Sequence, residues 1–213
     1  MMHTPPVSLA RRGARRLSRL IRRGLRHERG VAAVEFSFIL PVLITMYFGT
    51  VELSMAIGHE RKSSLLARTL SDLVTQSANV TNSDMASIFA AAKAVLAPYP
   101  VDKLAMRVTS YRIDSAKAVF VDWSDVNNTN ATGFAYTALG RCTDGSANVP
   151  TDLRIASTSI VMAEVTVNHM PVVGYIVAKN GIKMTESLPM RPRVSNNVTH
   201  EGVATTACPG EKV

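Results

Sequence analysis

Cysteine is scarce in this sequence of 213 residues, which contains only Cys142 and Cys208. Neither lies in a C-x-x-C pair, and the five histidines are scattered, with none at ligand spacing from another. The G-x-S-x-G, Walker and H-E-x-x-H motifs are also absent from the sequence. Glu164 and His169 lie five apart on an expected strand, so they should point to opposite faces rather than form a site. The sequence therefore argues against an enzyme, and no metal or cofactor is expected.

Lysine and arginine are absent from residues 31–58, a run of 28 residues whose only acids are Glu35 and Glu52. A secretory signal has an apolar core of about 7–15 residues followed by a small-residue cleavage site. This run is longer than such a core, and its far end, Gly58-His59-Glu60, offers no such site. About 20 helical residues cross the hydrocarbon core of a lipid bilayer. We therefore expect residues 31–58 to form a single transmembrane helix.

The positive charge of the chain is concentrated ahead of this apolar run. The formal net charge is +8, and residues 1–30 account for all of it, because they hold one acid and nine arginines: Arg11, Arg12, Arg15, Arg16, Arg19, Arg22, Arg23, Arg26 and Arg29. Residues 31–213 are left with 15 basic and 15 acidic groups. Arginines beside a membrane helix stay in the cytoplasm, and the opposite flank, residues 59–62, is far less charged. We expect residues 1–30 to be a basic cytoplasmic leader, and no nucleic acid as a partner, since no recognition module follows the arginines.

The two acids of the apolar run lie 17 residues apart, or about 25 Å along a helix. They can sit near opposite borders of a hydrocarbon core about 30 Å thick, where a carboxylate costs less than at the centre. A position at the two membrane borders is therefore a sufficient explanation for both acids. For Glu52 this explanation and a functional role both stay open. Pro41 removes a backbone hydrogen bond and should kink the helix, and Gly49 adds a second soft point.

Residues 59–213 are expected to form an α+β head outside the membrane. Apolar residues recur at three- and four-residue steps through Leu70 and Val74, so the membrane helix should continue to about Ser77. A second helix should open at Ser83-Asp84 and end before Pro98. Extended segments are expected at 104–113, 117–124, 158–170, 171–179 and 182–194, with an Asn/Thr/Gly loop at 125–133. These segments predict an antiparallel sheet of three or four strands.

Both cysteines lie in this exported head. If the compartment is oxidising, Cys142 and Cys208 can pair and close a loop of roughly 65 residues, which is worth about 4 kcal/mol in the chain-entropy model. The alternative is two unpaired buried thiols.

The string "RGVAAVEF" at 29–36 resembles the processing signal of type IV prepilins. In that signal a basic leader ends in Gly, and four mostly apolar residues precede a Glu and an aromatic residue. The resemblance implies that a prepilin peptidase cuts between Gly30 and Val31. Val31 would then be the first residue of the mature chain, Glu35 the fifth and Phe36 the sixth.

The longer string "RGVAAVEFSFILPVLITMYFGTVELSMAI" is similar to the TadE-like family of pseudopilins from tight-adherence (Flp) pilus systems. Its pattern is met by Gly30, Ala32, Ala33, Glu35, Phe36, Pro41, Gly49 and Glu52. The resemblance implies a minor pseudopilin in the bacterial inner membrane, with a periplasmic head, that assists assembly or initiation of the pilus. Implied partners are a prepilin peptidase, other pilins and pseudopilins, and the inner-membrane assembly platform. It also implies that Glu35 sets the axial register of the subunit.

Two other interpretations are open at this point. The chain could keep its N-terminus and act as a single-pass, membrane-anchored scaffold of an envelope machine. It could also be a periplasmic hydrolase on an anchor, although no motif supports that class. The N-terminal residue of the protein made in its host distinguishes the pseudopilin from the uncleaved scaffold.

Overall fold

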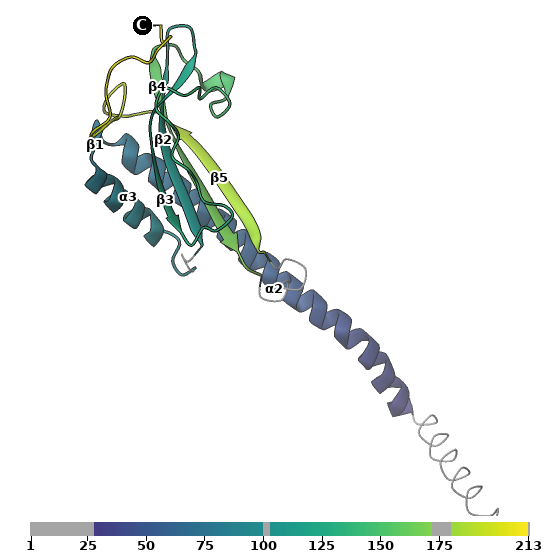
Figure 1. Ribbon diagram of the computed structural model, residues 1–213. Helices are drawn as coiled ribbons and strands as arrows, with labels where there is room; N and C mark the ends of the chain where they lie inside the picture. The colour runs from purple at the N-terminus through teal and green to yellow at the C-terminus, as the bar shows by residue number, and fades with distance from the viewer. Residues whose placement is uncertain (1–27, 100–102, 172–179, 213) are drawn as a thin grey trace, which may run out of the picture. The chain divides into compact units, whose positions relative to one another are not determined.

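The computed structural model describes residues 28–99, 103–171 and 180–212. The chain divides into two compact units between Val51 and Glu52. The described part of the first unit belongs to helix α2 (Glu28–Thr75), which continues into the second. The second unit also contains helix α3 (Asn82–Ala94) and a four-stranded antiparallel sheet (Figure 1). The predicted α+β fold, with a long apolar N-terminal helix, a second helix and an antiparallel sheet, is confirmed.

Helix α2 is the described helix that is long and apolar enough to cross a membrane. The part of α2 that belongs to the first unit exposes large apolar side chains on every side, and Phe38, at 77%, is the most exposed of them. The helix was expected to end near Ser77 and ends at Thr75. Most of the predicted leader and nearly all of segment 171–179 lie outside the described residues.

In the second unit α2 packs by one face. Leu66, Leu70 and Val74 are fully buried, as their spacing predicted, and they belong to one core cluster with Phe89 of α3. The same cluster includes Met106 and other residues from the sheet. The two helices and one face of the sheet therefore enclose the main hydrophobic core.

Helix α3 begins with a capping box, which explains why it starts at Asn82, one residue before the predicted start. The Thr81 hydroxyl accepts a hydrogen bond from the Asp84 backbone N–H at 3.1 Å, and the Asp84 carboxylate accepts one from the Thr81 N–H at 2.9 Å. These two bonds satisfy donors that a helix start leaves unpaired. Hydrogen bonds from the backbone and side chain of Thr81 lower the pKa of Asp84 below its ordinary value, and they outweigh the opposing effect of burial.

Thr81→Ala should therefore destabilise the head by about 1 kcal/mol, since it removes the capping hydroxyl. Urea unfolding of the full-length protein in detergent micelles measures this loss. Ser87→Ala on the same helix is the matched control, because its hydroxyl only returns to the Ser83 carbonyl oxygen of the preceding turn. Equal midpoints for the Thr81→Ala and Ser87→Ala variants would contradict the capping role.

The main sheet has the order β3-β2-β4-β5. Its strands are β2 (Leu104–Ile113), β3 (Val119–Thr129), β4 (Thr158–His169) and β5 (Ile182–Met190). A separate parallel pair joins β1 (Asn79–Val80) to β6 (Thr199–His200), and a 3-10 turn spans Thr151–Leu153. The two central strands are β2 and β4, and the whole of β2 pairs with residues 158–167 of β4.

The predicted loop at 125–133 begins too early. Residues 125–129, expected to begin an Asn/Thr/Gly loop, instead complete β3, whose Thr129 pairs with Leu104 at the start of β2. Asparagine disfavours strands locally, but a long central partner strand offers backbone hydrogen bonds that override this preference. At the other end of the sheet β5 stops at Met190, shortly before Pro192, earlier than its predicted extent to 194.

The other face of the sheet is covered at one end by a loop. Tyr111 and Ile113 of β2 and Ile160 of β4 form a second apolar cluster with Val149, against which Leu153 also packs. Along β2 and β4 these positions alternate with those of the main core, so the cluster lies on the opposite face. The sheet is thus buried on both sides near the end at which β2 finishes.

Candidate functional site

The residues of the expected processing signal lie on the first turns of described helix α2. Val31 and Phe36 are 54% and 57% exposed, and Glu35 is exposed as well. Val31 and Glu35 are four positions apart, so their side chains lie on one face of the helix, about 6 Å apart along its axis. The arrangement presents a carboxylate one turn after the position at which cleavage would create an ammonium group. Cleavage between Gly30 and Val31 itself stays a prediction.

Pro41 and Gly49 lie within helix α2, which continues through both. Proline lacks the N–H that would bond the preceding turn, and the Thr45 hydroxyl donates to the Pro41 carbonyl oxygen at 2.7 Å. A Cβ placed on Gly49 would meet no described atom within 4 Å. Packing within this chain therefore does not explain the glycine.

Glu52 has a partner that its place at the end of the apolar run did not predict. Its side chain is only 17% exposed, and Glu52 Oε1 lies 3.5 Å from Nε2 of His169, the last residue of β4. His169 shares the core-facing side of β4 with Val165 and Val167. Glu164 points to the opposite face, where its carboxylate accepts hydrogen bonds from Arg107 at 2.5 and 2.7 Å. The predicted opposition of Glu164 and His169 is thus confirmed, and Glu52 contacts the end of a strand of the sheet.

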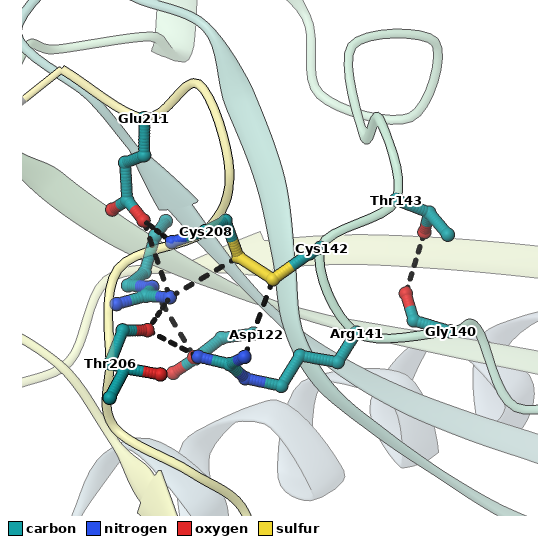
Figure 2. Close-up of a disulfide and its surroundings, with 9 residues drawn as sticks. Asp122, Gly140, Arg141, Cys142, Thr143, Thr206, Cys208 and Glu211 are labelled. Carbon is teal, nitrogen blue, oxygen red and sulfur yellow. Dashed lines mark hydrogen bonds and ion pairs between the residues drawn. A yellow bond between two sulfur atoms is a disulfide. The ribbon is translucent and has the colours of Figure 1, made fainter.

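Cys142 and Cys208 form a disulfide, as predicted, with their Cα atoms 5.3 Å apart (Figure 2). Arg141 Nη1 lies 3.4 Å from the Cys142 sulfur, and Arg112 Nη2 lies 3.5 Å from the Cys208 sulfur. Both guanidinium groups also donate to the carbonyl oxygen of Thr206. The disulfide and the two arginines together fasten the C-terminal segment to the sheet.

Asp114, at the turn after β2, holds the same C-terminal segment. Its carboxylate accepts hydrogen bonds from the backbone N–H groups of Ala116, Ala118 and Lys212 at 2.7–3.2 Å. Burial opposes the charge, but these donors outweigh it and hold the pKa of Asp114 below its ordinary value. The Ser115 N–H donates to the Lys212 carbonyl oxygen at 3.1 Å, which completes the attachment.

Two cavities lie on the surface of the head. One of about 350 Å³ lies beside Arg112, Asp114 and Lys212, and another of about 440 Å³ lies beside Trp123 and His200. Across the described parts of the chain, no group of three or more His, Cys, Asp or Glu side chains is placed to hold a metal ion.

Residues 30–62 match the family model described as TadE-like protein. This part of the chain is therefore similar to TadE-like proteins. The match includes the residues described above from Gly30 to Glu52, and it confirms the predicted resemblance over this part of the chain. The TadE-like segment continues to Lys62, so it enters the second unit, and the sheet lies outside the match. Searches among curated proteins and among solved structures gave no match.

Sequence reasoning missed the residues that meet the end of the TadE-like segment. The His59 ring contacts the rings of His169 and Tyr99 in tilted arrangements, with centroids 4.5 Å and 4.0 Å apart, respectively. One signal was present in the sequence, because His169 occupies a core-facing position of an otherwise apolar alternation. The identity of its partners depends on tertiary packing between segments more than 100 residues apart.

Proposed function

We propose that this protein is a minor pseudopilin, a structural and non-enzymatic subunit that assists assembly or initiation of a tight-adherence (Flp) type IV pilus. The observation that carries the proposal is the TadE-like match over residues 30–62, in which Gly30, Glu35 and Phe36 stand at the spacing of a prepilin signal. Further support comes from helix α2, whose apolar part is long enough to span a bilayer.

The proposed location is the bacterial inner membrane. The arginines of residues 1–30 favour a cytoplasmic N-terminus, and the neutral remainder of the chain favours export of the head to the periplasm. A disulfide in the head suits an oxidising compartment. The boundaries of the leader (1–30), the transmembrane helix (31–58) and the head (59–213) stay predictions.

Cleavage after Gly30 would give the subunit its assembly signal. The new ammonium group of Val31 and the Glu35 carboxylate, one helical turn away, can pair within the chain or between neighbouring subunits. In the low dielectric of a membrane border, such a pair offsets part of the desolvation cost of both charges. A subunit in the wrong axial position leaves the carboxylate unpaired, so the pair favours a single register.

The proposed partners follow from these steps. A prepilin peptidase removes the leader on the cytoplasmic side, and the inner-membrane assembly platform receives the mature subunit. Other pilins and pseudopilins pack against the apolar part of α2, whose exposed side chains need either lipid or protein around them.

The protein isolated from its host should begin at Val31. Gly30→Leu should leave the chain uncut, because a branched side chain would occupy the position next to the scissile bond. Gly49→Leu, in the same helix with open space around it, should be cut like the wild type. N-terminal sequencing and intact mass spectrometry of the three membrane-extracted proteins measure the outcome.

An intact leader on wild-type protein that still supports pili would overturn the pseudopilin assignment and favour the uncleaved scaffold. Cleavage of the Gly30→Leu protein at the same bond would contradict the role of the glycine. Failure of the Gly49→Leu protein to be cut would show that any bulky replacement in the helix blocks processing.

A further inference from the structure

One end of the second unit contains the residues at which the apolar run of α2 finishes. Strand β4 ends there at His169, whose side chain contacts Glu52 and whose ring lies against the ring of His59. Strand β5 begins at the same end, because Ile182 pairs with His169. The apolar run is expected to end at Gly58, between the two helix residues. The membrane location proposed above, on which this inference rests, therefore puts lipid headgroups at this end of the head.

Basic side chains gather at this end from four elements or their flanks. Lys93 of α3 donates to the Thr129 hydroxyl at the end of β3 at 3.0 Å, and the Asn168 N–H donates to the carbonyl oxygen of Lys103, just before β2, at 3.2 Å. Lys183 of β5 pairs with Asn168. Together with two residues of α2, these lysines form what we call the basic rim: Arg61, Lys62, Lys93, Lys103 and Lys183.

The basic rim is positively charged, although residues 31–213 as a whole are neutral. The described acids at this end are Glu52 and Glu60, so five bases and two acids leave a formal charge of +3. The neighbouring segments outside the described residues contain one acid, Asp102, and one base, Lys179, which leave this sum unchanged. The positive charge of the head is therefore concentrated where the proposed membrane surface lies.

Two lysines of the basic rim line a further surface cavity. Lys103 and Lys183 border a space of about 470 Å³, together with Asn168 and Phe134. Lys183 Nζ donates to the Gly133 carbonyl oxygen at 2.8 Å and lies 5.9 Å from the centre of the Phe134 ring, and both of these neighbours are uncharged. Among the described residues, none forms a hydrogen bond or ion pair with Lys103 Nζ. These contacts leave the two ammonium charges uncompensated.

The acids nearest to this cavity along the strands are directed elsewhere. Glu164 lies four positions before Asn168 on β4 and thus on the same face of the sheet, but its carboxylate accepts hydrogen bonds from Arg107 at 2.5 and 2.7 Å. Glu186 is three positions after Lys183 on β5, so it lies on the opposite face. The cavity therefore suits an external anion, such as a phosphate group with several acceptor oxygens.

We propose that the basic rim docks the head on anionic phospholipid, and that Lys103 and Lys183 bind the phosphate of one headgroup in the cavity that they line. Neighbouring strands are about 4.8 Å apart, so these two residues, on either side of Asn168, have Cα atoms about 10 Å apart. Their long, flexible side chains can reach one phosphate from these positions. Arg61 and Lys62 directly follow the apolar run, where basic side chains extend to the headgroups of the adjoining leaflet.

Lysine labelling of the full-length protein tests this contact residue by residue. All seven lysines of the chain lie after residue 61, so the arginine-rich leader takes no label. The protein is treated with an uncharged succinimidyl ester in nanodiscs of phosphatidylcholine, and in nanodiscs of equal parts phosphatidylcholine and phosphatidylglycerol. Peptide mass spectrometry should show labelling of Lys103 and Lys183 about fivefold slower in the anionic nanodiscs. About 1 M NaCl, which shortens the Debye length to about 3 Å, should remove the difference.

Two exposed lysines at the other end of the sheet are internal controls. Lys117 and Lys212 lie beyond the end of β2, whose ten residues span about 30 Å, and their labelling should be equal in both kinds of nanodisc. Lys183→Gln should return Lys103 in anionic nanodiscs most of the way to its rate in phosphatidylcholine, because the shared phosphate loses one partner. Lys117→Gln removes the same charge at the other end and should leave Lys103 protected.

Equal labelling of wild-type Lys103 in the two kinds of nanodisc would overturn the proposal. Slowing of Lys117 and Lys212 as large as that of Lys103 would also overturn it, and so would protection of Lys103 that survives Lys183→Gln, because a surface potential alone would then explain the result. A protein that inserts into both kinds of nanodisc but shows equal labelling loses only the lipid contact. A protein that fails to insert loses the proposed membrane location as well.

Discussion

Glu35→Val should leave the protein in the membrane and cleaved after Gly30, yet abolish its contribution to pilus assembly. The substitution removes the proposed partner of the Val31 ammonium group while keeping the apolar character of the helix. Removing one member of a buried ion pair typically costs about 3–5 kcal/mol, which corresponds to more than about a hundredfold in the population of the correct register. Counting pili by electron microscopy, with adhesion assays on the same cells, measures the loss.

Two further variants test whether the assembly defect comes from the lost charge of Glu35. Glu35→Asp keeps the charge and should restore part of the assembly, because the shorter carboxylate can still approach the ammonium group. Glu60→Val replaces an exposed acid of the same helix outside the apolar run and should assemble normally. Normal pili in Glu35→Val cells would remove the register role from Glu35.

The second large effect concerns the disulfide. Replacing both Cys142 and Cys208 by serine should lower the free energy of unfolding of the head by about 4 kcal/mol, because the bond closes a loop of 66 residues in the unfolded chain. The sequence contains a single tryptophan, and its buried indole N–H donates to the Val198 carbonyl oxygen at 2.7 Å. Fluorescence of Trp123 therefore reports urea unfolding of the full-length protein in micelles.

Reductant supplies the control for this experiment. Wild-type protein with dithiothreitol should unfold at the midpoint of the double serine variant, and the variant itself should not respond to the reagent. A loss below about 1 kcal/mol would show that Arg112, Arg141 and Asp114 hold the C-terminal segment without the covalent bond.

Local pattern predicted the elements whose boundaries are set by neighbouring residues. The predicted strand 104–113 coincides with β2, because its alternation ends at Asp114, which forms the turn. The extension of β3 to Thr129 was missed, because it depends on pairing with Leu104 rather than on its own asparagines. The two-residue strands β1 and β6 carry no local signal at all.

In the candidate site, too, some residues could be predicted from local sequence and others could not. Gly30, Val31, Glu35 and Phe36 lie within seven consecutive residues, so a short pattern was enough to single them out. The contact of Glu52 with His169 joins residues 117 positions apart, and their meeting depends on how α2 lies against β4. A sequence can show that a buried histidine is unusual, but the partner follows only from the packed fold.

The parallel pair β1–β6 has a consequence for the order in which the head can mature. Asn79–Val80 precede every strand of the main sheet, and Thr199–His200 follow all of them. A chain that emerges N-terminus first must therefore wait for residue 200 before the link between the two helices is fixed in place. Until then the apolar faces of α2 and α3 are incompletely covered, and during this interval a chaperone has the most surface to bind.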